Sequence, residues 1–235
     1  MANAKREERA RALMAFDDKW RDLGLVAGMD EVGRGPLAGD VVTACVVMPR
    51  EPLLPWVDDS KKLSESRREQ VYDQIMSTAL YVGIGRMSPE TIDRVNILEA
   101  TRLAMRQAAS QIPADVFLID AVRDLGLPGQ EIAIIKGDAA SYAIAAASIV
   151  AKVTRDREMR ALDAVYPQYG FARNKGYGTA EHIAALRQFG PCPCHRRSFI
   201  GHFVADICSG NHLRRNDPSF LQGDEKAKWK PMKQG

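Results

Sequence analysis

The spacing of apolar residues changes several times along the chain, and each change marks a predicted element of secondary structure. Short apolar runs with the length of β-strands occupy residues 25–32, 40–48, 80–87, 115–120 and 131–138. Apolar residues recur at helical spacing in residues 63–79, 88–96, 97–112, 140–162 and 179–190. Two adjacent strands followed by strands alternating with helices predict an α/β domain, with a mixed β-sheet flanked by helices and a helical C-terminal portion.

The predicted strands fall into two kinds. Residues 25–32 and 40–48 form a hairpin, because the segment GRGPLAG between them has the glycines and proline of a turn. Residues 115–120 and 131–138 are nearly continuous apolar runs, which are typical of strands buried on both faces of a parallel or mixed sheet.

The predicted helices carry recognisable start signals. Ser64, Ser88 and Thr179 precede helical segments as N-caps, and Pro89 suits a first turn. The segment 140–162 is rich in alanine, so this helix is expected to pack closely against a neighbour.

The pattern is weaker at both ends of the chain. We expect residues 1–23 to form an N-terminal helical extension, with Leu13, Met14, Phe16 and Trp20 along one side. Residues 24–201 then form the main domain, including its helical C-terminal part. Residues 202–235 form a C-terminal extension, whose basic end we expect to be mobile.

Composition narrows the class of protein. A chain of 235 residues with 46% hydrophobic residues can bury a sizeable core, and a net charge of +3 does not by itself indicate a nucleic-acid-binding protein. Residues 171–201 contain five basic residues and one acidic residue, which suits either a solvated face or a phosphate-facing patch. No apolar stretch approaches the ~20 residues of a membrane span, and the charged N-terminus lacks a signal core. We expect a cytoplasmic protein without a membrane partner.

The cysteines do not form a disulfide framework. Cys45, Cys192, Cys194 and Cys208 do not fall into two paired clusters, which favours a reduced protein. The segment CPCH at 192–195 has ligand types that zinc uses, but it lacks a second cluster, so the sequence alone does not predict a zinc site.

Acidic residues gather where predicted strands end. The segments AGMDE, FLID and IIKGD place Asp30, Glu31, Asp120 and Asp138 at these ends. Strand ends in open α/β sheets meet at one edge, and carboxylates brought together there repel one another unless a cation neutralises them. An all-oxygen acidic site favours Mg²⁺ or Mn²⁺, and two such ions suit in-line phosphoryl displacement.

Each acid also has a purely structural interpretation. Strict alternation along a strand sends Asp30 and Glu31 to opposite faces, so both reach one site only if the strand bends, which Gly33 permits. Asp120 suits the start of a turn. Asp138 suits the N-cap of the following helix.

Longer motifs connect the chain to a known family. The segments MDEVGRGPLAGDVV, DSKKLSESRRE, NILEAT, LID, KGDAASYAIAAASIVAKVTRD, YGFARNKGYGT and HRRSF occur in the order found in ribonuclease HII. The resemblance covers roughly residues 24–200. Because several of these motifs are long, their joint occurrence is specific to that family.

The resemblance implies a ribonuclease H-like fold and an endonuclease. Such an enzyme hydrolyses the RNA strand of RNA–DNA hybrids and nicks duplex DNA 5′ of an embedded ribonucleotide, leaving 3′-hydroxyl and 5′-phosphate ends. It uses two Mn²⁺ or Mg²⁺ ions during catalysis. The family's catalytic and metal-binding carboxylates fall on Asp30, Glu31, Asp120 and Asp138 of this sequence.

The resemblance also assigns residues that read the substrate. Gly33, Arg34 and Gly35 match the family's ribonucleotide-recognition motif. Glycines let backbone groups approach the ribose, whose 2′-hydroxyl distinguishes RNA from DNA. Tyr177 matches the family tyrosine that packs against the deoxyribose beside the ribonucleotide. Without the resemblance, Arg34 suits a solvated turn and Tyr177 suits an ordinary core or surface aromatic.

Further basic residues resemble family positions near the substrate backbone. Lys61, Lys62 and Arg196 are the candidates, with Arg197 as a similar one, and each also suits a solvated surface. His195 is expected to be structural rather than catalytic. We expect a monomer.

The chain departs from the family at residue 121, which is alanine where glycine is common. Two other functions share some of these features. A nuclease of the same fold class with different chemistry has the carboxylates without the ribose-reading turn, and it cuts all-DNA duplex equally well. A noncatalytic nucleic-acid-binding module binds without metal-dependent cleavage.

Overall fold

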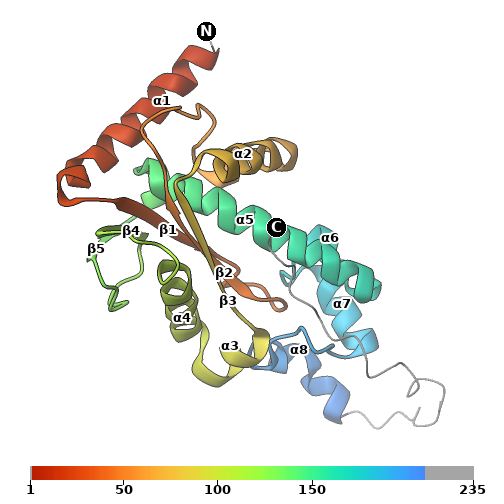
Figure 1. Cartoon of the computed structure of the whole chain (residues 1–235). Coiled ribbons are helices and arrows are strands. Elements are labelled where there is room, and N and C mark those ends of the chain that lie inside the picture. The colour runs from red at the N-terminus through yellow and green to blue at the C-terminus, as the bar shows by residue number, and fades with distance from the viewer. Residues whose placement is uncertain (1, 210–235) are drawn as a thin grey trace.

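A five-stranded mixed sheet forms the centre of the computed structural model, which describes residues 2–209 and the side chains of residues 4–204 (Figure 1). The strands lie in the order β3-β2-β1-β4-β5. Their bounds are β1 Val26–Val32, β2 Val41–Val47, β3 Tyr81–Met87, β4 Val116–Asp120 and β5 Gln130–Ile134. β1 pairs antiparallel with β2 and parallel with β4, which confirms the predicted hairpin and the mixed sheet.

Two helices cover opposite faces of this sheet (Figure 1). α5 (Tyr142–Val165) packs against β1 and β2, and α4 (Ile97–Ala109) packs against β2 and β3. The predicted close approach of the alanine-rich helix is present. A Cβ added to Gly28 of β1 would lie 2.1 Å from the backbone carbon of Ala143, so only glycine fits beneath α5.

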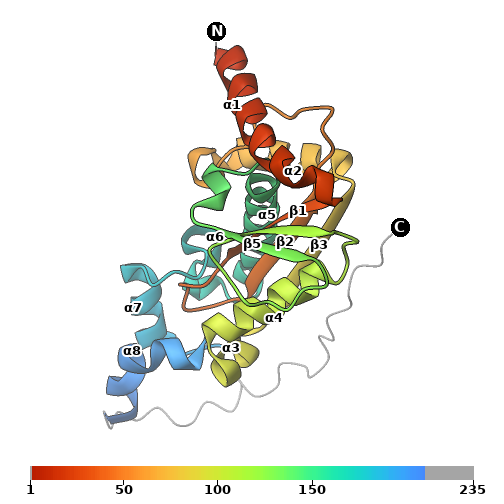
Figure 2. The same ribbon diagram turned by 90° about the vertical axis from the view of Figure 1, so that its left-hand side faces the viewer.

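The remaining helices surround these layers. α1 and the α7–α8 pair lie at opposite ends of the molecule (Figures 1 and 2). The predicted N-caps of α2, α3 and α7 are confirmed, because Ser64, Ser88 and Thr179 each accept a hydrogen bond from a first-turn amide. The α-helices are α1 Ala2–Asp17, α2 Glu65–Thr78, α3 Pro89–Val95, α6 Phe171–Asn174, α7 Ala180–Phe189 and α8 Arg197–Ser209. The 3₁₀ turns are η1 Asp18–Leu23, η2 Ser60–Lys62, η3 Gly137–Ala139 and η4 Pro167–Tyr169.

The prediction for residues 131–138 was wrong in one respect. β5 lies at the edge of the sheet and is only partly buried, and it ends at Ile134. Ile135 is 77% exposed, and Lys136 adopts a left-handed conformation that begins the η3 turn. An apolar run shows that a strand is favourable, but it does not show whether a further strand will cover it.

The two ends of the chain relate differently to the predicted extensions. Leu13 and Met14 of α1 are buried as expected, whereas Phe16 and Trp20 are only partly buried. α8 continues past residue 201 to Ser209, and the predicted basic tail from residue 210 lies outside the described residues. The division into extensions and a main domain stays a prediction. Among residues 2–209, no helix is both long and apolar enough to cross a membrane.

A buried carboxylate joins α1 to the start of α5. Asp17 is buried, and its Oδ2 accepts a hydrogen bond of 2.8 Å from the amide of Ala143. Its Oδ1 is buried without a partner in the protein. Burial raises the pKa of Asp17 to about 6, so the ionised form is costly in the folded protein.

The Asp17→Asn substitution should therefore change how stability depends on pH. Because the folded pKa of Asp17 is about 6 and its ordinary value is 3.8, the wild type loses stability as pH rises through this interval. The asparagine variant lacks that loss. The free energy of unfolding of the variant minus that of the wild type should therefore increase by up to ~3 kcal/mol between pH 4 and pH 7. Urea unfolding at both pH values measures this difference, with the exposed Asp22→Asn as control; an equal difference at both pH values contradicts it.

Candidate active site

The end of two parallel strands brings the first acidic residues together. The ladder between β1 and β4 ends with the pair Met29 and Ile119, so the next positions in the same register are Asp30 and Asp120. Asp138 lies in η3, which follows β5 and leads into α5. Three separate segments of the chain therefore bring carboxylates to the end of the sheet at which β1 and β4 finish. We call this end, with Asp30, Glu31, Asp120 and Asp138, the carboxylate edge.

Asp30 is one of the two buried acids of this group, together with Asp138. Its Oδ1 accepts a hydrogen bond of 2.8 Å from the Glu31 amide. Burial raises the pKa of Asp30 well above its ordinary value, and repulsion by Glu31 and Asp120 raises it further. The nearby Ser148 hydroxyl of α5 and the Glu31 amide oppose this shift only in part.

Glu31 follows without any break in the strand. β1 pairs with β2 in continuous register through Val32, and Gly33, with φ of 93°, turns the chain only after both acids. The Glu31 Oε1 lies 3.5 Å from Nη1 of Arg34, while its Oε2 is buried without a partner in the protein. Burial raises the pKa of Glu31, Arg34 opposes the shift, and repulsion by Asp120 adds to it.

The other two acids meet the η3 turn and a lysine. Asp120 accepts a hydrogen bond of 2.9 Å from the Gly137 amide, and both burial and repulsion by Asp138 raise its pKa. The buried Asp138 places Oδ2 3.2 Å from Nζ of Lys61, whose side chain is 80% exposed. The sequence analysis assigned Lys61 to the substrate backbone. It did not predict this ion pair, because 77 residues separate the partners.

The donor set fits a divalent cation. Within the part of the chain that the structure describes, Lys61 and Arg34 are the cations that pair with the four carboxylates, so negative charge remains there. The unpartnered Oε2 of Glu31 is a buried oxygen of the type that Mg²⁺ and Mn²⁺ prefer. Among the described residues, three potential ligand atoms come within 4.8 Å of one another only in a different group, Cys192, Cys194 and His195. No three of the four carboxylates therefore bring ligand oxygens within 4.8 Å of one another, and this separation is expected of like charges.

The glycine-flanked turn lies against the tyrosine predicted to read the substrate. A Cβ added to Gly35 would have the Tyr177 ring as its nearest contact, at 3.8 Å. The Leu37 amide donates a hydrogen bond of 2.8 Å to the carbonyl of Gly176. Tyr177 is 45% exposed. The ring and the backbone of the turn therefore share one solvent-facing surface.

Arg196 has a different place from the one expected of a residue that contacts substrate. It is fully buried, and its guanidinium donates hydrogen bonds to the carbonyls of Gly33, Arg34 and Gly39. Burial and repulsion by Arg155 lower its pKa to about 9, so it stays charged at neutral pH. Arg196 supports the turn from behind instead of facing a phosphate, and this differs from the sequence-based assignment.

Arg155 supports the same loop and was missed by sequence reasoning. It is fully buried in α5 and donates to the carbonyls of Ala38, Asp40 and Lys175. A Cβ added to Gly33 would lie 2.3 Å from its Nε. In sequence it is one of several arginines in TRDREMR, and nothing in that pattern distinguishes a buried arginine from a solvated one.

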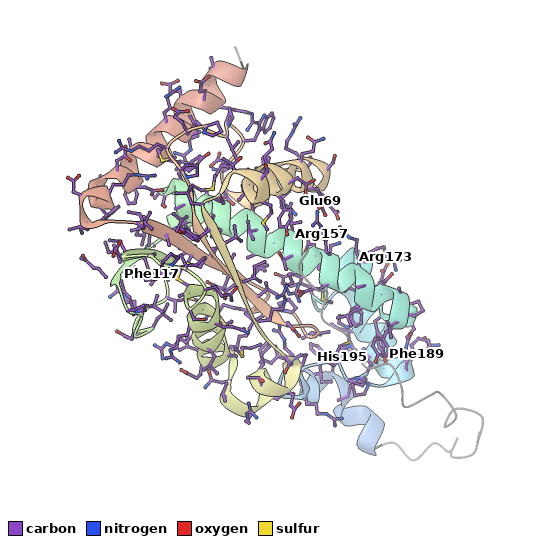
Figure 3. All side chains as sticks on the ribbon, in the orientation of Figure 1. Glu69, Phe117, Arg157, Arg173, Phe189 and His195 are labelled. Carbon is purple, nitrogen blue, oxygen red and sulfur yellow. The ribbon has the colours of Figure 1, made fainter. Side chains whose placement is uncertain are left out.

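Lys62 and the residues around His195 complete the predicted set. Lys62 pairs with Asp58 at 3.5 Å and contacts none of the four acids. His195 is buried, and it forms a bridge with Ala38 beside the turn between β1 and β2, where Figure 3 labels it. It hydrogen-bonds to His182 and Cys192 and to no acidic residue, in agreement with a structural role.

Comparison with known proteins shows which family the sequence matches. The family model of ribonuclease HII matches residues 27–202. A ribonuclease HII of Ruminiclostridium cellulolyticum is 51% identical over 201 residues, which cover 84% of this chain and 79% of the relative. A ribonuclease HII of Geobacter metallireducens is 53% identical over 178 residues, which cover 75% of this chain and 84% of the relative.

Solved structures have the same fold. The ribonuclease H2 of Pyrococcus horikoshii OT3 matches with a TM-score of 0.67 at 28% identity, covering 79% of this chain and 99% of that one. The ribonuclease HII in the PCNA complex from Archaeoglobus fulgidus matches with a TM-score of 0.65 at 26% identity, covering 84% and 100%. A Bst ribonuclease HIII in complex with Mn²⁺ is 18% identical, with a TM-score of 0.65 and coverage of 85% and 72%, and shows the fold alone.

The mixed sheet with flanking helices is therefore a ribonuclease H-like domain, as the sequence analysis expected. The chain belongs to the ribonuclease HII family. It is a metal-dependent endoribonuclease that hydrolyses the RNA strand of RNA–DNA hybrids and nicks duplex DNA at embedded ribonucleotides. Membership excludes the noncatalytic binding module and the nuclease of different chemistry that the sequence left open.

Proposed function

We propose that Asp30, Glu31, Asp120 and Asp138 are the catalytic carboxylates and that they hold two Mg²⁺ or Mn²⁺ ions. The observation that carries this assignment is their convergence from β1, β4 and η3, together with the raised pKa of three of them. Bound divalent cations favour the ionised carboxylates and offset their repulsion. The Mn²⁺ complex of the ribonuclease HIII with the same fold supports the choice of ion.

In this proposal each side chain has a defined task at the scissile phosphate. Ions held by the four carboxylates would activate a water and would stabilise the leaving 3′-oxygen. Asp30 is oriented by the Glu31 amide, and Asp120 is oriented by the Gly137 amide. Lys61 pairs with Asp138 and extends into solvent, where its ammonium group attracts the phosphate backbone.

Recognition of the ribonucleotide occurs at the adjacent turn. The backbone of Gly33, Arg34 and Gly35 faces the ribose 2′-hydroxyl, which both donates and accepts hydrogen bonds. The half-exposed Arg34 guanidinium reaches a phosphate, and the Tyr177 ring packs against the neighbouring deoxyribose. Support for this arrangement comes from the Tyr177 ring, which lies 3.8 Å from the place that a Cβ of residue 35 would take, and from the exposure of that ring. Lys62 is exposed and serves as a more distant backbone contact.

We further propose a monomer that acts in the cytoplasm. Every residue assigned above comes from one chain, so no second copy is required for the site. In the described part of the chain, Cys45, Cys192 and Cys194 are free thiols, which suits a reducing compartment. The PCNA complex of the related ribonuclease HII suggests a sliding clamp as a further partner for this chain.

The Asp138→Asn variant tests the assignment of the acids. Removing this charge should lower cleavage more than ~100-fold, because even indirect supports of a metal site cost 10–100-fold when lost. The assay uses a labelled DNA duplex with one ribonucleotide, with Mn²⁺, Mg²⁺ or chelator, and the cut is mapped at nucleotide resolution. Cleavage 5′ of the ribonucleotide, dependent on the ion, is expected for the wild type.

Asp124→Asn is a matched control for this change. Asp124 is an exposed acid in a left-handed conformation with φ of 59°, which asparagine tolerates well. Its activity should equal that of the wild type. Wild-type turnover in a folded Asp138→Asn variant would remove Asp138 from the catalytic set.

A further inference from the structure

A second group of potential metal ligands lies outside the carboxylate edge. Cys192, Cys194 and His195 place one ligand atom each within 4.8 Å of the others. The two sulfurs are 2.7 Å apart, and the Cys192 sulfur is 3.2 Å from Nδ1 of His195. Both cysteines are half-buried, whereas His195 is fully buried, so the group opens to solvent on its sulfur side.

The hydrogen bonds of two histidines fix which nitrogen of His195 is free to bind an ion. The carbonyl of Tyr177 can only accept, so Nδ1 of His182, 2.9 Å away, donates to it. The Nε2 of a neutral His182 is then an acceptor, and Nε2 of His195, 2.9 Å away, donates to it. The remaining nitrogen of His195, Nδ1, is therefore unprotonated, and it faces the cysteine sulfurs.

This arrangement is the one that metal-binding histidines adopt. One ring nitrogen binds the ion, while the other donates to a second group that sets the ring orientation. The ring of His195 is also held in place by Tyr169, at 4.7 Å between ring centres, and by Phe171, at 5.6 Å. A bound ion replaces the hydrogen bond of 3.0 Å that the Cys192 amide donates to Nδ1, and it replaces the thiol hydrogen bonds of the two cysteines.

We propose that Cys192, Cys194 and His195 form a binding site for a thiophilic divalent cation such as Zn²⁺, with solvent water as the fourth ligand. Two sulfurs and one imidazole nitrogen are the ligand types that zinc prefers. Binding releases the two thiol protons to solvent and changes no oxidation state. The site is separate from the four carboxylates, and it does not depend on their proposed role.

The position of the site gives it a structural task. The Cys194 carbonyl accepts a hydrogen bond of 2.8 Å from the Gly39 amide, and His195 forms a bridge with Ala38. Residues 192–195 thus dock directly on the loop that follows the glycine-flanked turn. An ion that fixes this segment also fixes the loop.

Cobalt is the probe for this site, because thiolate ligands give Co²⁺ an intense near-ultraviolet charge-transfer absorption that carboxylates do not give. Untagged full-length protein, reduced and freed of metal, is titrated with Co²⁺ and then with Zn²⁺. We expect one thiolate-bound Co²⁺ per chain, displaced by Zn²⁺. We also expect Zn²⁺ to raise the melting temperature of the reduced protein.

Cys192→Ser and Cys194→Ser should each weaken or abolish the charge-transfer absorption, while Cys45→Ala, a change in the buried centre of β2, should leave it intact. The proposal is overturned if the reduced wild type shows no such absorption, including the case in which its two thiols only form a disulfide. It is also overturned if the absorption survives both serine substitutions. Because the carboxylates do not produce this signal, neither result depends on the assignment of the catalytic acids.

Discussion

Replacing Asp30 with asparagine is expected to stabilise the folded protein while it removes most of the cleavage activity. Burial and the charges of Glu31 and Asp120 raise the pKa of Asp30, so the ionised carboxylate is costly to the folded state at neutral pH. Asparagine keeps an oxygen for the Glu31 amide and removes the charge. Without divalent ions, the free energy of unfolding should rise by about 1–3 kcal/mol, the usual range for a buried group that is poorly compensated.

Two measurements separate this result from a simple packing effect. Cleavage of the ribonucleotide-containing duplex should fall more than ~100-fold, because the variant lacks one of the four carboxylates that we propose bind the metal ions. The gain in stability should shrink as pH falls. Because the pKa of Asp30 is raised in the folded protein, acidification protonates Asp30 in the wild type and removes the cost of its buried charge. A variant that melts below the wild type in chelator at neutral pH contradicts the argument.

Replacing Arg196 with alanine should be among the most destabilising single changes in the chain. Its guanidinium satisfies the carbonyls of Gly33, Arg34 and Gly39, and the side chain is fully buried. Alanine leaves these acceptors without a donor and opens a cavity. A loss of about 3–5 kcal/mol is expected from the combined effects. Urea unfolding measures the loss directly.

Arg197→Ala is the matched control for this change. Arg197 is the exposed next residue, and its link to Asp93 runs through the backbone amide, so truncation should change stability by less than ~0.5 kcal/mol. If Arg196→Ala unfolds like the wild type and only binds hybrid more weakly, then Arg196 contacts phosphate after all. In that case the buried position described above is wrong.

The elements of the fold were predictable because their signals are local. Caps such as Ser64 and Thr179, the turn after Val32 and the spacing of apolar residues are each contained within a few residues. The edge position of β5 was not predictable in the same way, since it depends on whether a further strand is added next to it.

The candidate site was predictable where chemistry coincides with strand ends. Asp30 and Asp120 follow from that rule alone, and the shared register of β1 and β4 brings their positions together. The tasks of Lys61 and Arg196 were not predictable from the pattern. A cationic side chain has no intrinsic preference between solvent and a buried partner. The partner of Lys61 lies 77 residues away in the sequence, and the partners of Arg196 lie over 150 residues away.

The path of α5 has a consequence for where the enzyme cuts. Ser148 lies beside Asp30, and Arg155 donates hydrogen bonds to the loop that follows the glycine-flanked turn. These residues are seven positions apart, which is about 10 Å along an α-helix. One helix thus sets the spacing between the carboxylates and the loop behind the glycine-flanked turn. In the arrangement proposed above, a change in the length of this part of α5 would therefore move the cut relative to the ribonucleotide.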